Sequence, residues 1–533
     1  MAPRVGPAAL RVESSTVESA GLGLFAAEEL PEYVVIGEYS GEVKDYARFG
    51  EKVARLGHNE LHPFYLKPGL LAPPRIQTNF RGRIAHGIME PKRRRLEPDK
   101  ASWLSLLKVR LPHRDLVLAT DCGGGVGPAS ALRDLGVPIR HIFACESEES
   151  SQQLLAAQQS RPERLFGSMI GRDRGCFCLV SGRWMPMPTT QPDIYISNAG
   201  THGPNPDRFF AAVKYIMEFR PRLVILEDLV AACREDPQGN LPADAVLALL
   251  EQVGGYEVDL FHVFASHFGL PQRRQRLYYV MVSREHLKSE KVPDQIRQAL
   301  ERLKLHAFST TDAEELLEAA LDPGDVRIVC QLPHVTERGV DSLLSMSSDA
   351  SYLHRRLRHE LHLGEDAAYF ALAGNHLARW LRSYREADLC QIHWLWAQRQ
   401  NREIRFVSIS QDVHRASLSF TGEVPTLAAN TRLWSYRLQR VLSSREMLTL
   451  QGFKPAQWNL ESLSEASLSR VAGSAMTVHM IAALLAAALS AVRLEEPSCS
   501  QRRRSVSLAE LRSRYSAICQ RLHGVRRHAK LGA

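Results

Sequence analysis

A glycine-rich turn is the first feature of the sequence with the residue types of a binding site. The apolar run 116–119 leads into five small residues: Cys122, Gly123, Gly124, Gly125 and Gly127. Glycine lets the backbone approach a ligand closely, and a helix opened by Pro128 would direct its N–H groups toward that ligand. Glu146 ends the next apolar run, where a carboxylate accepts hydrogen bonds from ribose hydroxyls. The pattern fits a dinucleotide or S-adenosylmethionine; the alternative is a structural turn beside a surface acid.

Two acids and two arginines form a second candidate group. Glu227 and Asp228 follow the apolar run 223–226, and Arg274 and Arg276 lie in a Gln-Arg-Arg-Gln-Arg run. A second carboxylate beside the first raises the pKa of one of the two. The alternatives are an acidic strand end that faces solvent and a plain basic strand edge.

The elements that must position these residues alternate in type. Helical stretches at 207–219 and 244–253 lie among apolar runs of strand length: 116–119, 139–144, 194–196, 223–226, 258–263 and 277–282. Alternation of this kind predicts an α/β fold with a parallel, doubly wound sheet and a ligand site at the carboxyl ends of its strands.

Four segments resemble the cytosine-5 DNA methyltransferase family, in the family's order. They are 254–282 with its Phe-Gly-x-Pro-Gln-Arg signature, 422–434 with Pro-Thr-Leu, 440–455 with Arg-Glu and Leu-Gln-Gly-Phe, and 471–485 with Gly-Ser-Ala-Met-Thr-Val. The resemblance implies a Rossmann-type S-adenosylmethionine-dependent methyltransferase domain with a smaller target-recognition domain, and DNA, or alternatively RNA, as the partner. A nicotinamide-binding Rossmann protein would leave the Gln-Arg-Arg block unexplained.

The resemblance also assigns catalytic roles. The family adds a cysteine thiolate to carbon 6 of cytosine, which lets carbon 5 attack the methyl group. The loop after residue 196 aligns with Gly200 at the family's proline and Thr201 at its cysteine. The nucleophilic form of an alcohol is much scarcer at neutral pH than that of cysteine, whose free pKa is about 8.5. Activation of Thr201 by the adjacent His202 is the alternative to a loop that has lost its nucleophile.

Other positions match the family residue by residue. Glu227 matches the catalytic glutamate, with Asp228 in place of asparagine, and Arg274 and Arg276 would contact the flipped base or the phosphates. The cofactor would be bound by the glycine turn, in which Val126 replaces a glycine, and by Glu146. Two further cofactor residues are Asp173, for the adenine amino group, and Ser474, in place of the family's asparagine.

The two ends of the chain have their own character. Residues 10–90 resemble a truncated SET domain, a small mainly-β fragment, in Gly21–Phe25 and Glu38–Glu42, but they lack its catalytic block, so we expect structure or protein contact there. In the tail, Leu508, Leu511, Tyr515, Ile518 and Leu522 share one helical face, behind a capping box of Ser507 and Glu510. This helix would dock onto the body or a protein partner; its basic face could alternatively follow DNA phosphates.

Composition limits the class of protein. The 533 residues are 44% hydrophobic and carry a net charge of +8, which favours a multidomain globular protein with an anionic partner. Nine scattered cysteines fit neither a disulfide framework nor a zinc site, so we expect no metal. The apolar run 480–492 is shorter than the roughly 18 to 20 residues that span a bilayer, so we expect a buried helix and no membrane contact. Basic runs at 91–98 and 501–505 favour import into the nucleus.

Six segments and two functional hypotheses follow. The segments are a truncated SET-like segment (10–90), a basic linker (91–113), the S-adenosylmethionine-binding catalytic domain (114–285), a target-recognition-like region (286–430), a C-terminal return of the methyltransferase domain (431–493) and a basic amphipathic tail (494–533). One hypothesis is an active transferase that works despite Thr201. The other is a nucleic-acid-binding or regulatory protein that keeps the fold without the chemistry.

Overall fold

The structure is a computed structural model of the whole chain. It describes residues 10–14, 22–26, 100–122, 126–156, 161–170, 172, 175–198, 200, 206–235, 241–289, 291–306, 312–320, 359, 384–411, 417–438, 440–458, 460, 463–495 and 506–531. Two compact units divide the chain, 1–94 and 95–533. In the first unit, β1 (Leu10–Ser14) pairs antiparallel with β2 (Leu22–Ala26). The rest of the SET-like segment lies outside the described residues, as do the basic runs 91–98 and 501–505.

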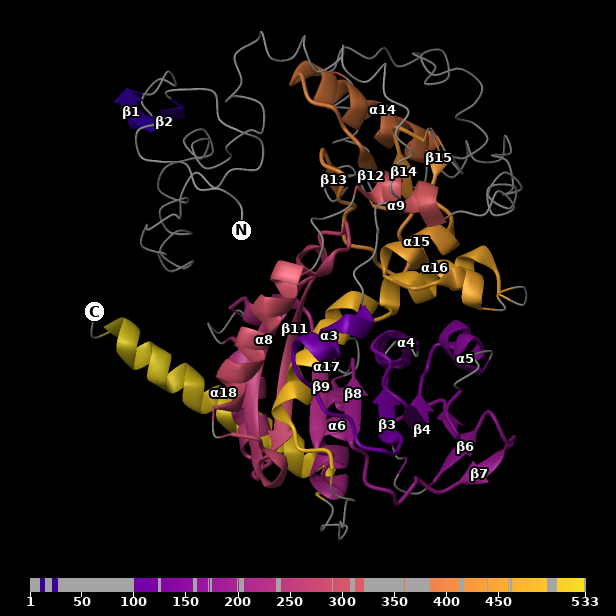
Figure 1. Cartoon of the computed structure of the whole chain (residues 1–533), viewed down its shortest axis with the longest axis vertical. Coiled ribbons are helices and arrows are strands. Elements are labelled where there is room, and N and C mark those ends of the chain that lie inside the picture. The colour runs from indigo at the N-terminus through magenta and orange to yellow at the C-terminus, as the bar shows by residue number, and fades with distance from the viewer. Residues whose placement is uncertain are drawn as a thin grey trace. The chain divides into compact units, whose positions relative to one another are not determined.

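A nine-stranded sheet is the frame of the second unit (Figure 1). Its order is β10-β11-β9-β8-β3-β4-β5-β6-β7. The six predicted strands are all present and form its centre and one edge: β3 (Leu116–Asp121), β4 (Ile139–Cys145), β8 (Ile194–Ser197), β9 (Leu223–Asp228), β10 (Tyr256–Phe264) and β11 (Gln275–Ser283). The three remaining strands complete the other edge: β5 (Leu165–Phe166), β6 (Cys176–Cys178) and β7 (Arg183–Met185).

The sheet is parallel in its central part, as predicted, and antiparallel at both edges, which the prediction did not include. The pairs β9·β8, β8·β3, β3·β4 and β4·β5 are parallel. At one edge β11 runs antiparallel to both β9 and β10, and at the other β6 runs antiparallel to β5 and β7. The segment between β10 and β11 is too short for the crossover that parallel strands need, roughly a dozen residues or more, so the chain turns back.

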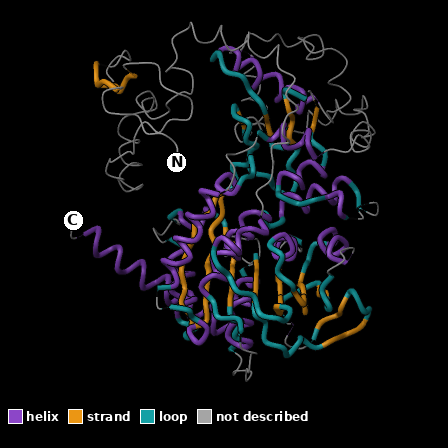
Figure 2. Tube along the Cα trace, viewed as in Figure 1, coloured by secondary structure: helices purple, strands orange, loops and turns teal. Residues whose placement is uncertain are grey.

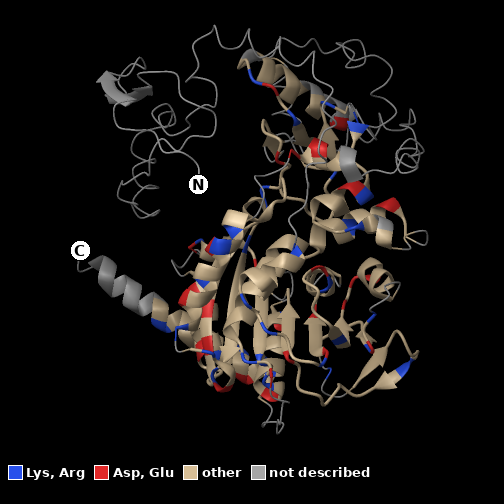
Figure 3. Ribbon diagram, viewed as in Figure 1, with Lys and Arg blue, Asp and Glu red and all other residues tan. Residues whose placement is uncertain are grey.

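Helices cover both faces of the sheet (Figure 2). Alternate strand residues point to opposite faces, so Ile194 and Ile196 join one core cluster and Tyr195 joins the other. The first cluster includes side chains of α3 (Lys100–Leu106), α4 (Gly127–Asp134), α5 (Glu149–Ala156), α8 (Val292–His306) and α17 (Val478–Ala491); the second includes α6 (Asp207–Phe219), α7 (Pro242–Glu251) and α18 (Leu508–Leu531). In Figure 3 the central strands are mostly free of charged residues, as two buried faces require.

The apolar run near the end of the chain is a buried helix, as predicted. All side chains of α17 from Val478 to Leu489 are buried. A stretch across α16 (Glu465–Ser474) and α17 has the length and hydropathy of a membrane span, but 94% of it is buried inside the protein. Packing in the core therefore accounts for its apolar character.

The predicted basic linker 91–113 contains helix α3 at Lys100–Leu106, which the prediction did not include. Trp103 is 1% exposed and packs edge-on against Phe268, with ring centroids 6.3 Å apart. The Lys100 ammonium lies 2.8 Å from Asp134 Oδ2 of α4. One buried aromatic and one buried ion pair thus attach this segment to the catalytic domain.

A second, smaller sheet lies in the region expected to recognise the target. Its order is β13-β12-β14-β15, and all pairs are antiparallel. It follows α9 (Ala313–Ala320) and α14 (Tyr384–Arg399) and consists of β12 (Phe406–Ser408), β13 (Leu418–Ser419), β14 (Leu433–Ser435) and β15 (Arg440–Val441). It extends past the predicted boundary at residue 430, and the return to the catalytic domain begins with α15 (Ser444–Leu450), so we correct that boundary.

Candidate active site

Glu227 lies at the carboxyl end of β9 and is held from the neighbouring strand β11. Antiparallel register places Tyr278 directly opposite Glu227. Tyr278 donates its hydroxyl to Glu227 Oε2 at 2.6 Å, and Arg276 Nε lies 3.5 Å from Glu227 Oε1. Burial first, and the Glu227 charge second, raise the pKa of Tyr278 well above 10, so its hydroxyl remains a donor. The Glu227 carboxylate is 1% exposed and has a fixed orientation.

Arg274 has a different position from the one that the resemblance implied. It is 1% exposed and donates to the carbonyl oxygens of Leu427 (3.1 Å), Gly473 (3.3 Å) and Ala475 (3.0 Å). Its Nη2 is 3.9 Å from Glu227 Oε1. Burial is the main reason that its pKa is lowered to about 10. The guanidinium is used inside the protein, so direct contact with a phosphate or base is not available to it in this structure.

The segments that carry the family resemblance converge around Arg274. Val424 N donates to the Pro271 carbonyl and Arg273 N donates to the Val424 carbonyl, so 271–273 pairs with 424. Gly473 packs against the backbone of Ala428 with no room for a side chain. These contacts join three of the four segments.

The remaining segment, 440–455, is joined to the closing segment, 471–485, by Gln451. Thr477 donates to Gln451 Oε1 at 2.7 Å, while Gln451 Nε2 donates to the Ala472 carbonyl at 2.6 Å. His479 Nδ1 lies 3.0 Å from the Phe268 carbonyl. Burial lowers the pKa of His479 well below 6.5, so it is neutral and Nδ1 is the donor. The Leu-Gln-Gly-Phe block therefore supports the closing block, and the closing block in turn contacts the signature loop.

The glycine turn opens at the carboxyl end of β3, next to the end of β4. The backbone of Cys122 has a φ of 49°, a left-handed conformation that is unusual for a residue other than glycine. Its N–H donates to the Cys145 carbonyl. Gly127 starts α4, where an added Cβ would lie 2.6 Å from the Met476 carbonyl oxygen. The start of α4 is therefore packed against the segment 473–476, whose Gly473 and Ala475 carbonyls accept from Arg274.

Glu146 follows β4 and is 5% exposed. Desolvation first, then the charges of Glu146 and Asp121, raise the pKa of Cys122 to about 12, so this thiol is protonated at neutral pH. Arg208, near the start of α6, donates to the Ser147 hydroxyl at 3.0 Å and thus lies at the same edge. Glu146, Ser147 and Cys122 together define what we call the cofactor edge, and Arg208 contacts it.

Five predicted site residues lie outside the described residues: Gly123, Gly124, Gly125, Asp173 and Thr201. Gly200, the neighbour of Thr201, is described. An added Cβ at Gly200 would collide with the carboxylate of Asp228, whose Oδ1 accepts from the Leu229 N–H at 2.7 Å. Gly200 thus lies against the end of β9, and the two departures from the family at 200 and 228 fit each other sterically.

Ser474 lies at the end of α16 next to Gly473 and is exposed. Its hydroxyl donates to the Arg470 carbonyl at 2.8 Å. The structure thus places one group of predicted residues at the carboxyl ends of β3 and β4: Cys122, Gly127 and Glu146. A second group lies at the end of β9: Glu227, Arg274 and Arg276. Residues 473–476 contact both groups.

Two residues of the site were missed at the sequence level. Tyr278 lies within the apolar run 277–282, and only its register opposite Glu227 reveals its role. Arg208 lies in the predicted helix 207–219. Its place in the first turn after the loop of Thr201 was a sequence signal for a role in the site.

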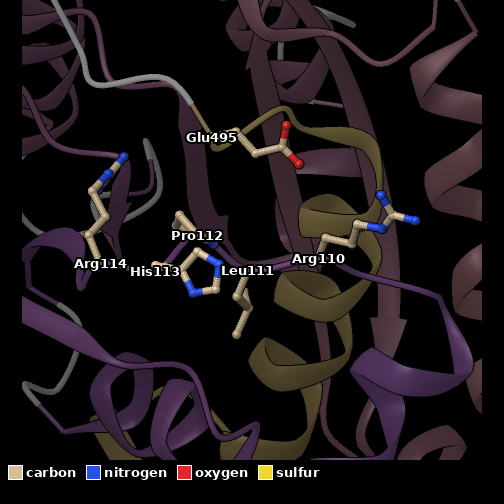
Figure 4. A pocket seen from close by; sticks show the side chains of 6 residues that line it. All are labelled: Arg110, Leu111, Pro112, His113, Arg114 and Glu495. Atoms are coloured by element: carbon tan, nitrogen blue, oxygen red, sulfur yellow. The ribbon is translucent and has the colours of Figure 1, made fainter.

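A surface pocket lies elsewhere (Figure 4). It is lined by Arg110, Leu111, Pro112, His113, Arg114 and Glu495. Arg114 precedes β3 and pairs with Asp193, which precedes β8, so this pocket adjoins the amino ends of the strands. It is therefore separate from the candidate active site at the carboxyl ends.

The comparison with known families agrees with this geometry. Residues 195–490, more than half of the chain, match the model of the C-5 cytosine-specific DNA methylases. The chain belongs to this family. The match includes β8, Glu227, both arginines and the closing block, and the family's methyl donor is S-adenosylmethionine.

Other family members are similar at low identity. The protein named DNA (cytosine-5-)-methyltransferase DMT5 from Cryptococcus neoformans is 23% identical over 438 residues, which are 71% of this chain and 17% of that protein. The protein of the same name from Verticillium dahliae is 24% identical over 311 residues, 55% of this chain and 13% of that protein. The chain thus spans less than a fifth of the length of these methylase relatives.

Two solved structures are also similar. The S. pombe Dnmt2 methyltransferase is 12% identical with a TM-score of 0.41, over 70% of this chain and 98% of that one. A putative DNA modification methyltransferase encoded within an E. coli prophage is 14% identical with a TM-score of 0.40, over 70% and 98%.

Proposed function

We propose that this chain is a DNA cytosine-5 methyltransferase-like protein that binds S-adenosylmethionine and an extruded cytosine, and that its natural transfer step is slow. The observation that carries the proposal is the convergence on Arg274. One buried guanidinium ties three of the four segments that resemble the family to one another, beside the carboxylate of Glu227.

The residues at the cofactor edge fit S-adenosylmethionine. Glu146 would accept hydrogen bonds from the ribose hydroxyls. Asp121, at the end of β3, uses one oxygen for Arg172 and Tyr195, while its buried Oδ1 has no hydrogen-bond partner among the described residues. A buried acceptor without a partner is unfavourable, and a ligand donor at this edge would satisfy it. When bound, the cofactor supplies an electrophilic methyl group.

Glu227 and Arg276 would act on the cytosine ring. Glu227 is fixed by Tyr278 and would hydrogen-bond the base near N3, where charge develops. Of Arg274 and Arg276, only Arg276 has a side chain that is partly open to a ligand, at 14% exposed. It would fix the position of the base relative to Glu227. Thr201 would take the nucleophile's place, with a hydroxyl that is a weaker nucleophile than a thiolate.

A second candidate function is a non-catalytic reader of DNA or RNA. It is favoured by the contact of Gly200 with Asp228, because the Asp228 carboxylate puts negative charge next to position 201, where a thiolate would form in the family. For this function we further propose a nuclear location and a protein-contact role for the SET-like segment 10–90.

Calorimetry of S-adenosylmethionine binding tests the cofactor site. We expect the natural chain to bind, and Glu146→Gln to bind about tenfold to a hundredfold more weakly, because it loses hydrogen bonds to a charged acceptor. Glu149→Gln, an exposed acid three positions further along that pairs with Gln153, is the matched control and should bind like the natural chain. Equal affinity in all three proteins would place the cofactor elsewhere.

A further inference from the structure

The C-terminal helix α18 is packed onto the catalytic domain next to the start of α6. Leu511 and Ile518 are 1% and 2% exposed. Tyr515 meets Phe209 and Phe210 edge-on, with ring centroids 6.5 and 5.7 Å apart. Figure 1 shows α18 (yellow) lying against the body at its first turns and then running away from it. The apolar face predicted for the tail is thus used inside the chain.

An ion pair between Arg512 and Asp207 joins α18 to the first turn of α6. Arg512 Nε donates to Asp207 Oδ1 at 2.8 Å, and Arg512 Nη2 lies 2.6 Å from Asp207 Oδ2. Asp207 is the first residue of α6. The two-point contact of a planar guanidinium with a carboxylate fixes orientation as well as distance.

The next residue of α6 reaches the cofactor edge. Arg208 donates to Ser147, which follows Glu146, and its charge acts on the Cys122 thiol. The first turn of α6 is therefore held on one side by α18 and contacts the cofactor edge on the other.

The two kinds of contact have different consequences. The side chains of Arg512 and Asp207 are 50% and 31% exposed, and ion pairs at that exposure add little to stability. The buried Leu511 and Ile518 supply the binding free energy of the helix. The ion pair is thus suited to orient α6 and contributes little to holding the protein folded.

We propose that α18 is an internal brace for the cofactor edge, with Arg512 as the positioning residue and Arg208 as the residue that it positions. The role of Arg208 at a cofactor rests on the proposed function; the brace itself does not. Without α18, the first turn of α6 opens more often and the Arg208 contact with Ser147 is made less often.

Hydrogen–deuterium exchange of the ligand-free protein tests the brace. Amides of residues 207–212 should exchange about fivefold faster in Arg512→Ala, and at least tenfold faster in the double variant Leu511→Ala with Ile518→Ala. Arg514→Ala is the matched control, because Arg514 pairs with Glu510 within α18. Exchange at 207–212 that is unchanged in both test variants, or that rises equally in Arg514→Ala, would overturn the brace.

Cofactor affinity and charge reversal test the positioning role. Arg512→Ala should bind S-adenosylmethionine about threefold to tenfold more weakly with an unchanged melting temperature, and Arg512→Asp combined with Asp207→Arg should restore affinity. Unchanged affinity in Arg512→Ala, beside normal binding by the natural chain, would refute the positioning role. Failure of the natural chain to bind the cofactor would refute the proposed function, and the exchange experiment would still decide on the brace.

Discussion

Replacing Thr201 with cysteine is expected to raise the rate of methyl transfer to cytosine in DNA by about a hundredfold or more. A few per cent of a free cysteine is thiolate at neutral pH, whereas the alkoxide of threonine is far scarcer and needs a positioned base. Position 201 follows Gly200, which lies against Asp228 at the end of β9, beside Glu227. The rate is measured by transfer of labelled methyl groups to duplex DNA under single-turnover conditions.

Two companion variants make this result specific. Glu227→Gln in the Thr201→Cys protein should abolish most of the gain in transfer rate, because the cytosine ring then lacks the carboxylate that stabilises its developing charge. Cys233→Ser should leave the gain intact, because Cys233 is an exposed thiol whose pKa is raised by partial burial and by Asp244 and Asp228. A Thr201→Cys protein no faster than the natural chain would contradict the assignment of position 201.

Replacing Arg274 with alanine is expected to lower the free energy of unfolding by about 3 to 5 kcal/mol. The substitution removes the donors for three carbonyl groups in two segments and leaves the buried Glu227 with less positive charge nearby. Removal of one partner from a buried charged network costs about this much, because the remaining groups cannot reach water. Urea unfolding of the natural and variant chains measures the difference.

An exposed arginine supplies the control for this experiment. Arg284 has a side chain that is 64% exposed and pairs with Glu257 on the surface, so Arg284→Ala should change the unfolding free energy by about 0.5 kcal/mol or less. A loss below about 1 kcal/mol for Arg274→Ala would show that the segments are held together by other contacts.

The strands and the place of Glu227 at the end of β9 could be predicted from sequence because their signals are local. The runs 194–196 and 223–226 are apolar and bounded by turns, and Glu227 stands where such a run ends. The direction of β11 could also have been predicted, because the segment that joins it to β10 cannot hold a crossover. The length of this connection, and not the number of strands, sets the direction of the edge strand β11.

The role of Arg274 could not be predicted in the same way. In the sequence it is one of three similar arginines, and burial alone separates it from Arg273 and Arg276. Its carbonyl partners lie more than 150 residues away in the chain. Helix α3 was missed for a similar reason, since Trp103 is fixed by Phe268 and by packing against α17 and not by the basic, proline-containing residues around it.

In the proposed function, the glycine turn, Glu227 and Arg276 form one cleft for a methyl donor and an extruded cytosine, and Arg274 holds the segments around it. The most direct test is mass spectrometry of nucleosides from DNA that has been incubated with S-adenosylmethionine and the Thr201→Cys protein. We predict 5-methylcytosine as the product, at a much lower level with the natural chain. Methylation of another base, or no methylated base although both proteins bind the cofactor, would contradict the claim.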